Sequence, residues 1–172
     1  MDTRAAHALR DGAYAARRAG CEAGARALGV RLLCDLAPSQ LDGALRQLKP
    51  GLAPLVRHVV TEEARVARVV SRLESGDPRS VGEVLTAGHA SLRDDFAVSC
   101  AELDLAVAAA CRAGALGARM TGGGFGGSVV VLTEEADAAG VARDVDAAFA
   151  AGGHRPPRVF AVAPEDGARR DR

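Results

Sequence analysis

Aromatic residues are scarce in this sequence of 172 residues. They make up 3% of it, with four phenylalanines, one tyrosine and no tryptophan. Hydrophobic residues still account for 48% of the chain, so it can build a core, but that core has to be aliphatic and rich in alanine. A chain of this length suits one domain better than two. We therefore predict a single domain over residues 1–172.

An excess of charge of one sign is also missing. The sequence has 22 basic and 22 acidic residues, which give a formal net charge of zero, and no basic stripe runs along it. Proteins that bind nucleic acid usually show a basic excess or a basic face, so nucleic acid is not an expected partner. No apolar stretch reaches the length of a membrane span, so we expect no membrane insertion either.

Signals for metal binding and secretion are absent as well. The cysteines form no C-x-x-C pair, and none of the four histidines completes a zinc-binding cluster with them. Because no secretory signal is present, we expect reduced thiols and a cytoplasmic location. The four cysteines are Cys21, Cys34, Cys100 and Cys111.

The sequence does contain a helical pattern in its first two thirds and a strand pattern after it. Apolar residues at helical spacing, bounded by glycine, proline or serine, predict helices at 11–28, 39–48, 53–74, 79–94, 101–113 and 134–151. Short apolar runs predict strands at 118–121, 128–133 and 157–162. A helix-rich part followed by β-loop-β-α-β indicates an α+β fold, with a small, mostly antiparallel sheet packed on helices. The polar residues 165–172 are expected to form a frayed tail.

The most informative segment is the glycine tract from Met120 to Ser128, which reads M-T-G-G-G-F-G-G-S. Glycine permits positive φ and close approach by another group, and consecutive free backbone N–H groups can bind an anion. A loop beside a phosphorylated ligand and a tight turn between two strands are both compatible with this composition. The tract has no P-loop lysine. Gly122, Gly124 and Gly127 match the G-x-G-x-x-G spacing, but a strand follows where that motif needs a helix.

Several polar residues have two interpretations. Asp94 and Asp95 could bind a divalent cation or act as a general base, but we favour a surface stretch at a helix end with an Arg–Asp pair. His58 and His89 lie within predicted helices, and a structural hydrogen bond or solvent exposure is favoured over catalysis. A thiolate at Cys100 could be stabilised by a helix start, although a small buried residue is the simpler interpretation.

Four segments, in order, resemble the galactokinases, a family within the GHMP small-molecule kinases. Residues 119–127 are similar to the third signature motif, and residues 11–22 to a helix written [SD]-x-E-Y-x-x-R-R-x-x-C-E. Residues 58–62 resemble the segment H-V-V-x-E, and residues 91–104 resemble S-L-R-D-D-[YF]-x-V-S-x-P-E-L-D. Together they span nearly the whole chain, whereas the glycine loop alone would indicate only the superfamily.

The resemblance implies transfer of the ATP γ-phosphoryl group to the anomeric hydroxyl of galactose, with Mg²⁺. It implies that Tyr14 binds the sugar, an assignment that competes with half-buried packing of this single tyrosine. No catalytic residue and no metal ligand is implied. The loop that would lie near the nucleotide phosphates and the sugar consists of Gly122, Gly123, Gly124, Phe125, Gly126 and Gly127.

The departures from the family are as informative as the match. Galactokinases are about twice this length, and nothing here resembles their sugar-recognition motif, their G-L-S-S-S phosphate loop or their catalytic aspartate. Smaller changes are Ala13 in place of Glu, Ala101 in place of Pro, and Ser128 where Cys is frequent. We therefore expect a galactokinase C-terminal half, inactive alone, with a separate N-terminal kinase half as a possible partner. A non-catalytic binding or regulatory module, and part of a kinase for a related sugar, are the alternatives.

Overall fold

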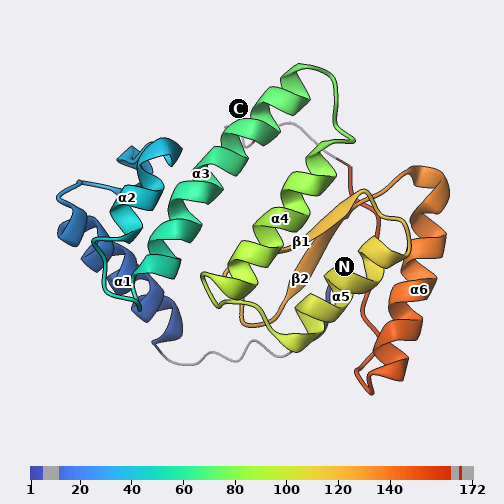
Figure 1. The fold of residues 1–172 in the computed structure, drawn as a ribbon. Coiled ribbons are helices and arrows are strands. Elements are labelled where there is room, and N and C mark those ends of the chain that lie inside the picture. Colours follow the sequence, from blue (N-terminus) through green and yellow to red (C-terminus); the bar gives the residue numbers. More distant parts are fainter. Residues whose placement is uncertain (6–11, 164–166, 168–172) are drawn as a thin grey trace, which may run out of the picture.

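The computed structural model describes residues 1–5, 12–163 and 167, and it confirms the predicted α+β fold. Helices come first, followed by two strands and a last helix (Figure 1). The α-helices are α1 Ala13–Leu28, α2 Leu41–Leu45, α3 Ala53–Glu74, α4 Val81–Asp94, α5 Ala101–Arg112 and α6 Ala138–Ala151. The strands are β1 Gly117–Thr121 and β2 Ser128–Leu132, and single 3-10 turns lie at Leu33–Asp35, Pro38–Gln40 and Glu135–Asp137.

Local signals set most helix ends. Gly29 closes α1 in the left-handed conformation, with φ 67°, and its N–H bonds back to the carbonyls of the last turn. Helix α3 begins at Ala53, with a proline in its first turn. The predicted helix 39–48 is shorter in the structure, because Pro38 first starts a 3-10 turn in which the Gln40 side chain accepts the Ala37 N–H at 2.9 Å.

The sheet is a β1–β2 antiparallel pair with Gly117 opposite Leu132 and Thr121 opposite Ser128. Because side chains alternate along a strand, Ala118, Met120 and Val129 share one face, and all three are buried. On the opposite face Arg119 pairs with Val130, which is 45% exposed. Helices α5 and α6 supply the core residues that pack against the buried face.

Helix α4 protects the free edge of β1. The backbone N–H of Ala118 donates to the Thr86 hydroxyl at 3.2 Å, and that of Met120 donates to His89 Nδ1 at 3.3 Å. At the start of the strand Gly117 lies so close to Gly82 of α4 that a Cβ on either residue would overlap backbone atoms. Side chains of α4 thus accept hydrogen bonds from backbone N–H groups of β1 that an open edge strand would leave free.

The predicted third strand, 157–162, is wrong. Among the described residues this segment forms only an isolated bridge at Arg158, whose backbone exchanges two hydrogen bonds of 2.8 Å with Asp2. Asp2 also bridges Ser128 of β2, so residues 1–3 lie between β2 and this segment. Beyond the bridge Phe160 and Val162 are 60% and 76% exposed. The predicted frayed tail, 165–172, lies outside the described residues except for Gly167.

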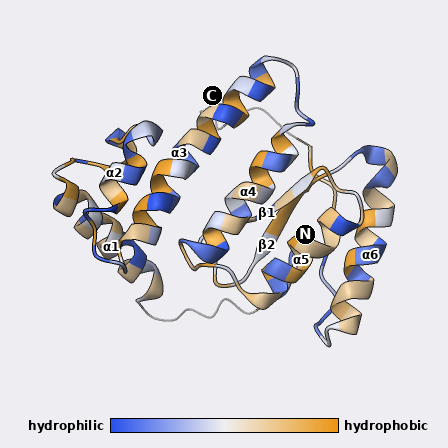
Figure 2. Cartoon of the chain, viewed as in Figure 1, coloured by the Kyte–Doolittle hydropathy of each residue, from blue (hydrophilic) through white to orange (hydrophobic). Residues whose placement is uncertain are grey.

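Two clusters form the core, and both are mostly aliphatic, as the composition predicted, with Phe149 as the buried aromatic exception. The larger lies between the sheet, α5 and α6, and includes Leu103 and Phe149, both fully buried. The smaller joins α1 to α3 around Val56 and Val60. Figure 2 shows hydrophobic colour on the strands and on α5 and α6, which lie beside them. Of the helices described, none has the length and apolar character needed to cross a membrane.

Candidate functional site

The glycine loop between β1 and β2 has a backbone that few sequences could adopt. Four of its glycines have positive φ, from 86° to 136°, and Phe125 also has a positive φ of 60°. Left-handed backbone is strained for residues with a Cβ, so Phe125 stores strain that other contacts must offset. The positive-φ glycines are Gly122, Gly124, Gly126 and Gly127.

The middle of the loop is docked on the α4–α5 connection. The Phe125 N–H donates to the Val98 carbonyl at 2.7 Å, and a Cβ at Gly124 would overlap that same carbonyl oxygen. The Phe125 side chain packs against the larger core cluster. These contacts hold Phe125 in its strained conformation and make Gly124 the residue that permits the close approach.

The two ends of the loop differ in exposure. At the downstream end, the Thr3 hydroxyl and backbone N–H both donate to the Gly127 carbonyl, at 2.6 and 3.0 Å. At the upstream end Gly122 and Gly123 are exposed, and a Cβ on either would have no neighbour within 4 Å. The loop is therefore fixed at its middle and downstream end, and open to an approaching group at Gly122 and Gly123.

A buried histidine connects the upstream strand to α5. His89 is 2% exposed, accepts the Met120 N–H at Nδ1, and contacts Asp104 Oδ1 through Nε2 at 3.0 Å. The Ser99 hydroxyl donates to the same aspartate oxygen. Burial lowers the pKa of His89, although the neighbouring Asp104 carboxylate opposes that effect. His89 therefore has the structural hydrogen bonds that the sequence analysis favoured for it.

A second histidine network joins α3 to α4. His58 Nδ1 lies 2.9 Å from the Ser91 hydroxyl, which donates to Asp95 Oδ2 at 3.0 Å, and Asp95 pairs with Arg57 at 2.7 Å. The residue types match a Ser-His-Asp triad, but the aspartate contacts the serine and not the histidine, which is the wrong order for nucleophilic catalysis. The His58 ring also stacks on Phe96, at 4.5 Å between ring centroids. The network braces two helices.

The remaining acidic and thiol candidates have structural explanations. Asp94 forms an exposed pair with Arg93 at 2.7 Å, which is the Arg–Asp pair that we favoured. Asp94 and Asp95 interact with different partners, as expected for neighbours on a helix. Cys100 immediately precedes α5, and burial raises the pKa of its thiol, which disfavours a thiolate there.

Tyr14 lies in the first turn of α1 and is 66% exposed, so the half-buried alternative is wrong. Arg17, one turn later on the same helical face, donates to the Ala97 carbonyl at 3.3 Å. Ala97 precedes Val98, on which the glycine loop is docked. The start of α1 therefore lies next to the connection that carries the loop, and Tyr14 has an accessible hydroxyl.

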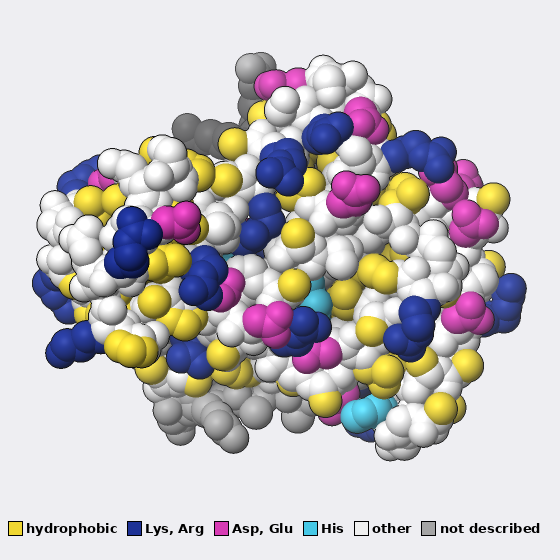
Figure 3. All heavy atoms as spheres, viewed as in Figure 1, with side chains coloured by type: hydrophobic (Ala, Val, Ile, Leu, Met, Phe, Trp, Pro, Cys, Tyr) yellow, Lys and Arg dark blue, Asp and Glu magenta, His cyan; other side chains and the backbone are white. Residues whose placement is uncertain are grey.

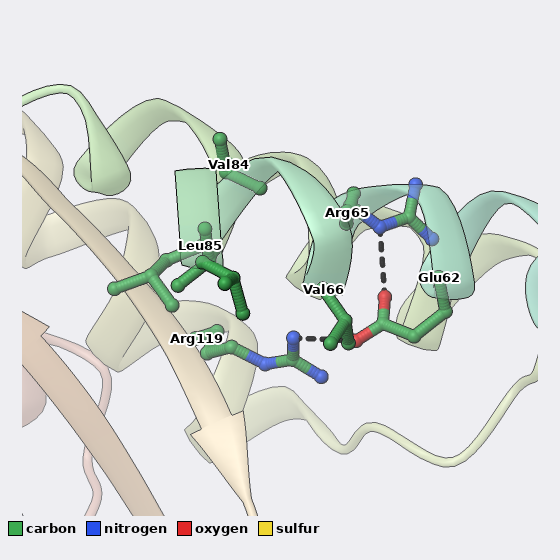
Figure 4. A pocket seen from close by; sticks show the side chains of 8 residues that line it. Glu62, Arg65, Val66, Val84, Leu85 and Arg119 are labelled. Atoms are coloured by element: carbon green, nitrogen blue, oxygen red, sulfur yellow. Dashed lines mark hydrogen bonds and ion pairs between the residues drawn. The ribbon is translucent and has the colours of Figure 1, made fainter. Parts of the chain in front are cut away.

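A shallow apolar cavity of about 220 Å³ lies between α3, α4 and β1, and its lining includes no residue of the glycine loop. Figure 4 shows Arg119 extending from β1 towards Glu62 of α3, which also pairs with Arg65. Although burial opposes it, hydrogen bonds from Arg119 and Arg65 hold the pKa of Glu62 below its usual range. On the face that Figure 3 displays, basic and acidic side chains are interspersed, in keeping with the formal net charge of zero. The cavity is lined by Glu62, Arg65, Val66, Val69, Val70, Val84, Leu85 and Arg119.

The open end of the glycine loop is a stretch of backbone that an anion could approach. Gly122 and Gly123 are exposed, a Cβ on either would have no neighbour within 4 Å, and consecutive backbone N–H groups in such a loop can bind an anion. No group of three or more His, Cys, Asp or Glu side chains within this part of the chain is placed to hold a metal ion. A magnesium ion is often bound through substrate phosphates and only one or two carboxylates, so we name no residue for it.

Comparison with known proteins gives consistent matches. Residues 69–151 match the family model described as GHMP kinases C terminal. The galactokinase of Streptomyces coelicolor is 57% identical over 172 residues, covering 99% of this chain and 44% of the relative. That of Mycobacterium tuberculosis H37Rv is 43% identical over 159 residues, covering 92% of this chain and 44% of the relative.

A solved structure agrees with these relatives. The Lactococcus lactis galactokinase, crystallised with galactose, superposes with a TM-score of 0.83 at 29% identity, over 89% of this chain and 41% of that protein. The chain thus spans less than half the length of the relatives that it matches. The sequence matches, the shared fold and the docked glycine loop lead to one assignment: the chain belongs to the GHMP kinase family, as a C-terminal domain of the galactokinase type.

Proposed function

We propose that this chain supplies the C-terminal part of a galactose-phosphorylating active site, which uses ATP and Mg²⁺. The observation that carries the proposal is the glycine loop, docked on Val98 yet open at Gly122 and Gly123, in a chain 57% identical to a galactokinase. The reaction would transfer the γ-phosphoryl group to the anomeric hydroxyl. The proposal includes a cytoplasmic location, where ATP is available.

Two features of the chain, the glycine loop and Tyr14, have geometry compatible with the proposed roles. Phosphoryl transfer depends mainly on positioning and on stabilising charge, and a rigid loop with accessible N–H groups can do both for a phosphate. The Tyr14 hydroxyl would hydrogen-bond the sugar from the adjacent helix start. The catalytic carboxylate and the remaining phosphate contacts would come from a kinase N-terminal half, which is the partner that we propose.

A chimera tests this proposal. The chain would replace the matching C-terminal part of the Streptomyces coelicolor galactokinase, and ADP release would be measured with Mg·ATP, with and without galactose. We expect galactose-dependent turnover by the chimera and none by the 172-residue chain alone. A chimera that unfolds cooperatively but shows no turnover would overturn the proposal. Turnover that is faster with another sugar would overturn galactose as the substrate.

Turnover by the chain alone would contradict the proposed division of labour, because it would require a catalytic base within these 172 residues. Failure of both proteins to turn over, with tight binding of another protein by the chain alone, would favour the non-catalytic binding module. The parent galactokinase serves as the positive control, and the chimera without galactose measures background hydrolysis of ATP.

A further inference from the structure

One carboxylate oxygen connects the two segments that hold the glycine loop. On the upstream side, the Met120 N–H donates to His89 Nδ1, and His89 Nε2 lies 3.0 Å from Asp104 Oδ1. On the other side, the Ser99 hydroxyl donates to the same Oδ1 at 2.5 Å. Ser99 follows Val98, whose carbonyl accepts the Phe125 N–H. Both connections therefore meet at Asp104.

The direction of each hydrogen bond follows from the donors. The Met120 backbone N–H can only donate, so Nδ1 of His89 is an acceptor and the hydrogen of the neutral ring is on Nε2. That hydrogen is donated to Asp104 Oδ1, and the serine hydroxyl supplies the second donor. Because a neutral ring satisfies this pattern at both nitrogens, the network requires no charge on His89.

We propose that Asp104 is a positioning residue that sets the glycine loop from both sides, through His89 to the end of β1 and through Ser99 to the Val98 platform. Its significance for catalysis rests on the proposed role of the loop at the nucleotide phosphates. Asp104 lies in the first turn of α5, where the helix N-terminus also favours a carboxylate. The helix therefore acts as the fixed body to which both loop segments are attached.

A purely structural role would have a different signature. If Asp104 only braced α4 against α5, its loss would lower the stability of the whole domain and would expose core and loop amides alike. If it positions the loop, the Phe125 amide loses protection while α6 amides, such as those of Val145 and Phe149, keep theirs. Val145 and Phe149 are fully buried and have no part in the network.

Hydrogen exchange of the 172-residue chain, followed by NMR, separates these roles. We expect Asp104→Ala to lower the protection of the Phe125 amide by about tenfold, the effect of one net hydrogen bond, with the α6 amides unchanged. Asp104→Asn should keep most of the protection, because its side-chain oxygen can accept both hydrogen bonds at the same position. Asp94→Ala, which removes an exposed aspartate paired with Arg93, is the matched control and should change neither.

If Asp104→Ala does not fold, Ser99→Ala removes one of the two connections and should still lower Phe125 protection. An unchanged Phe125 amide in a folded Asp104→Ala or Ser99→Ala chain would overturn the proposal. So would an equal loss of protection at Phe125 and in α6. In the chimera, Asp104→Ala should lower kcat, and Asp104→Asn should restore it. A chimera without turnover would reject the proposed function and leave the exchange result standing.

Discussion

The two ends of β1 both depend on glycine, but for different physical reasons. At the start of the strand, Gly117 and Gly82 allow α4 to contact the strand backbone, and neither has a positive φ. After the end of the strand, the glycine loop needs left-handed backbone, and a Cβ on either of its first two glycines would have no neighbour within 4 Å. The first pair is explained by packing alone. The loop is not, because Gly123 has neither a positive φ nor a neighbour that a side chain would meet.

This difference separates residues that maintain the fold from residues available to a ligand. A glycine needed for packing should affect stability and act on activity only through unfolding. A glycine kept for access should affect activity and leave stability alone. A single added methyl group at either end of β1 tests this distinction.

The largest expected effect on stability is at the packed end. A Cβ in Gly117→Ala would overlap the backbone carbonyl of Gly82, which cannot move without shifting α4. We expect the free energy of unfolding to fall by about 3 kcal/mol, measured by denaturant titration. Gly140→Ala in α6 is the control, since its Cβ would meet only an arginine side chain at 3.8 Å. Equal stability of both variants would contradict the packing explanation.

At the open end, Gly123→Ala should have the opposite profile. No clash and no left-handed backbone is involved, so the free energy of unfolding should change by less than about 0.5 kcal/mol. In the chimera, kcat/KM for Mg·ATP should fall by about tenfold or more, since a methyl group would occupy the phosphate approach. Gly51→Ala, another exposed glycine without neighbours, should change neither. Full activity of Gly123→Ala would show that a methyl group at this position does not hinder the nucleotide.

Acid should weaken the scaffold that carries the loop. Burial lowers the pKa of both His58 and His89 below the ordinary histidine value of 6.5. The unfolded chain therefore binds protons at a higher pH than the folded chain does, and stability falls as the pH drops below about 6.5. Each histidine contributes at most about 1.4 kcal/mol per pH unit. Denaturant titrations from pH 7.5 to 5 should show this loss of unfolding free energy, and the loss should be smaller in His89→Gln. If the free energy of unfolding depends on pH equally in both proteins, His89 is excluded as a source.

The charged groups around each ring do not reverse the lowering of the two histidine pKa values. Glu62 and Asp95 favour a charged His58, and Arg65 and Arg119 disfavour it, but burial is the largest influence. Asp104 favours a charged His89, with Arg93 and Arg119 opposing it, and burial again dominates. The lowered pKa of Glu62 acts in the same sense, since its ion pairs are lost as the carboxylate is protonated.

The smallest effect on the fold is expected at Tyr14. Its side chain is 66% exposed, so Tyr14→Phe should leave the unfolding midpoint unchanged. Loss of one hydrogen bond to the sugar should raise the galactose KM of the chimera by about two- to tenfold, with the KM for ATP unchanged. An unchanged galactose KM would reject the sugar-binding role.

Local signals allowed much of this fold to be predicted from sequence. Helix α3 has the predicted bounds, because Pro54 and the Ser75-Gly76 break both lie within a few residues of its ends. The error at 157–162 has a non-local cause, since an apolar run becomes a strand only where a partner backbone continues beside it. Among the residues that the structure describes, this run pairs only with Asp2 and forms no further ladder.

The residues of the candidate site could be predicted from the sequence, but the hydrogen bonds that hold them could not. The glycine tract and Tyr14 are visible in the sequence, either by composition or by resemblance. The hydrogen bonds that hold the loop join residues far apart in the chain, such as Thr3 to Gly127 and His89 to Met120. No spacing rule predicts these pairs. The only signal for Asp104 was its place in the segment 91–104 that resembles the family.

The most direct test of the central claim, that the glycine loop is held open for a nucleotide phosphate, is a crystal structure of the chimera with galactose and a non-hydrolysable ATP analogue. We predict a phosphate oxygen within hydrogen-bonding distance of the Gly122 or Gly123 N–H, the Phe125 N–H still bonded to Val98, and a sugar hydroxyl at Tyr14. A nucleotide bound elsewhere, with the loop in contact with neither ligand, would contradict this account.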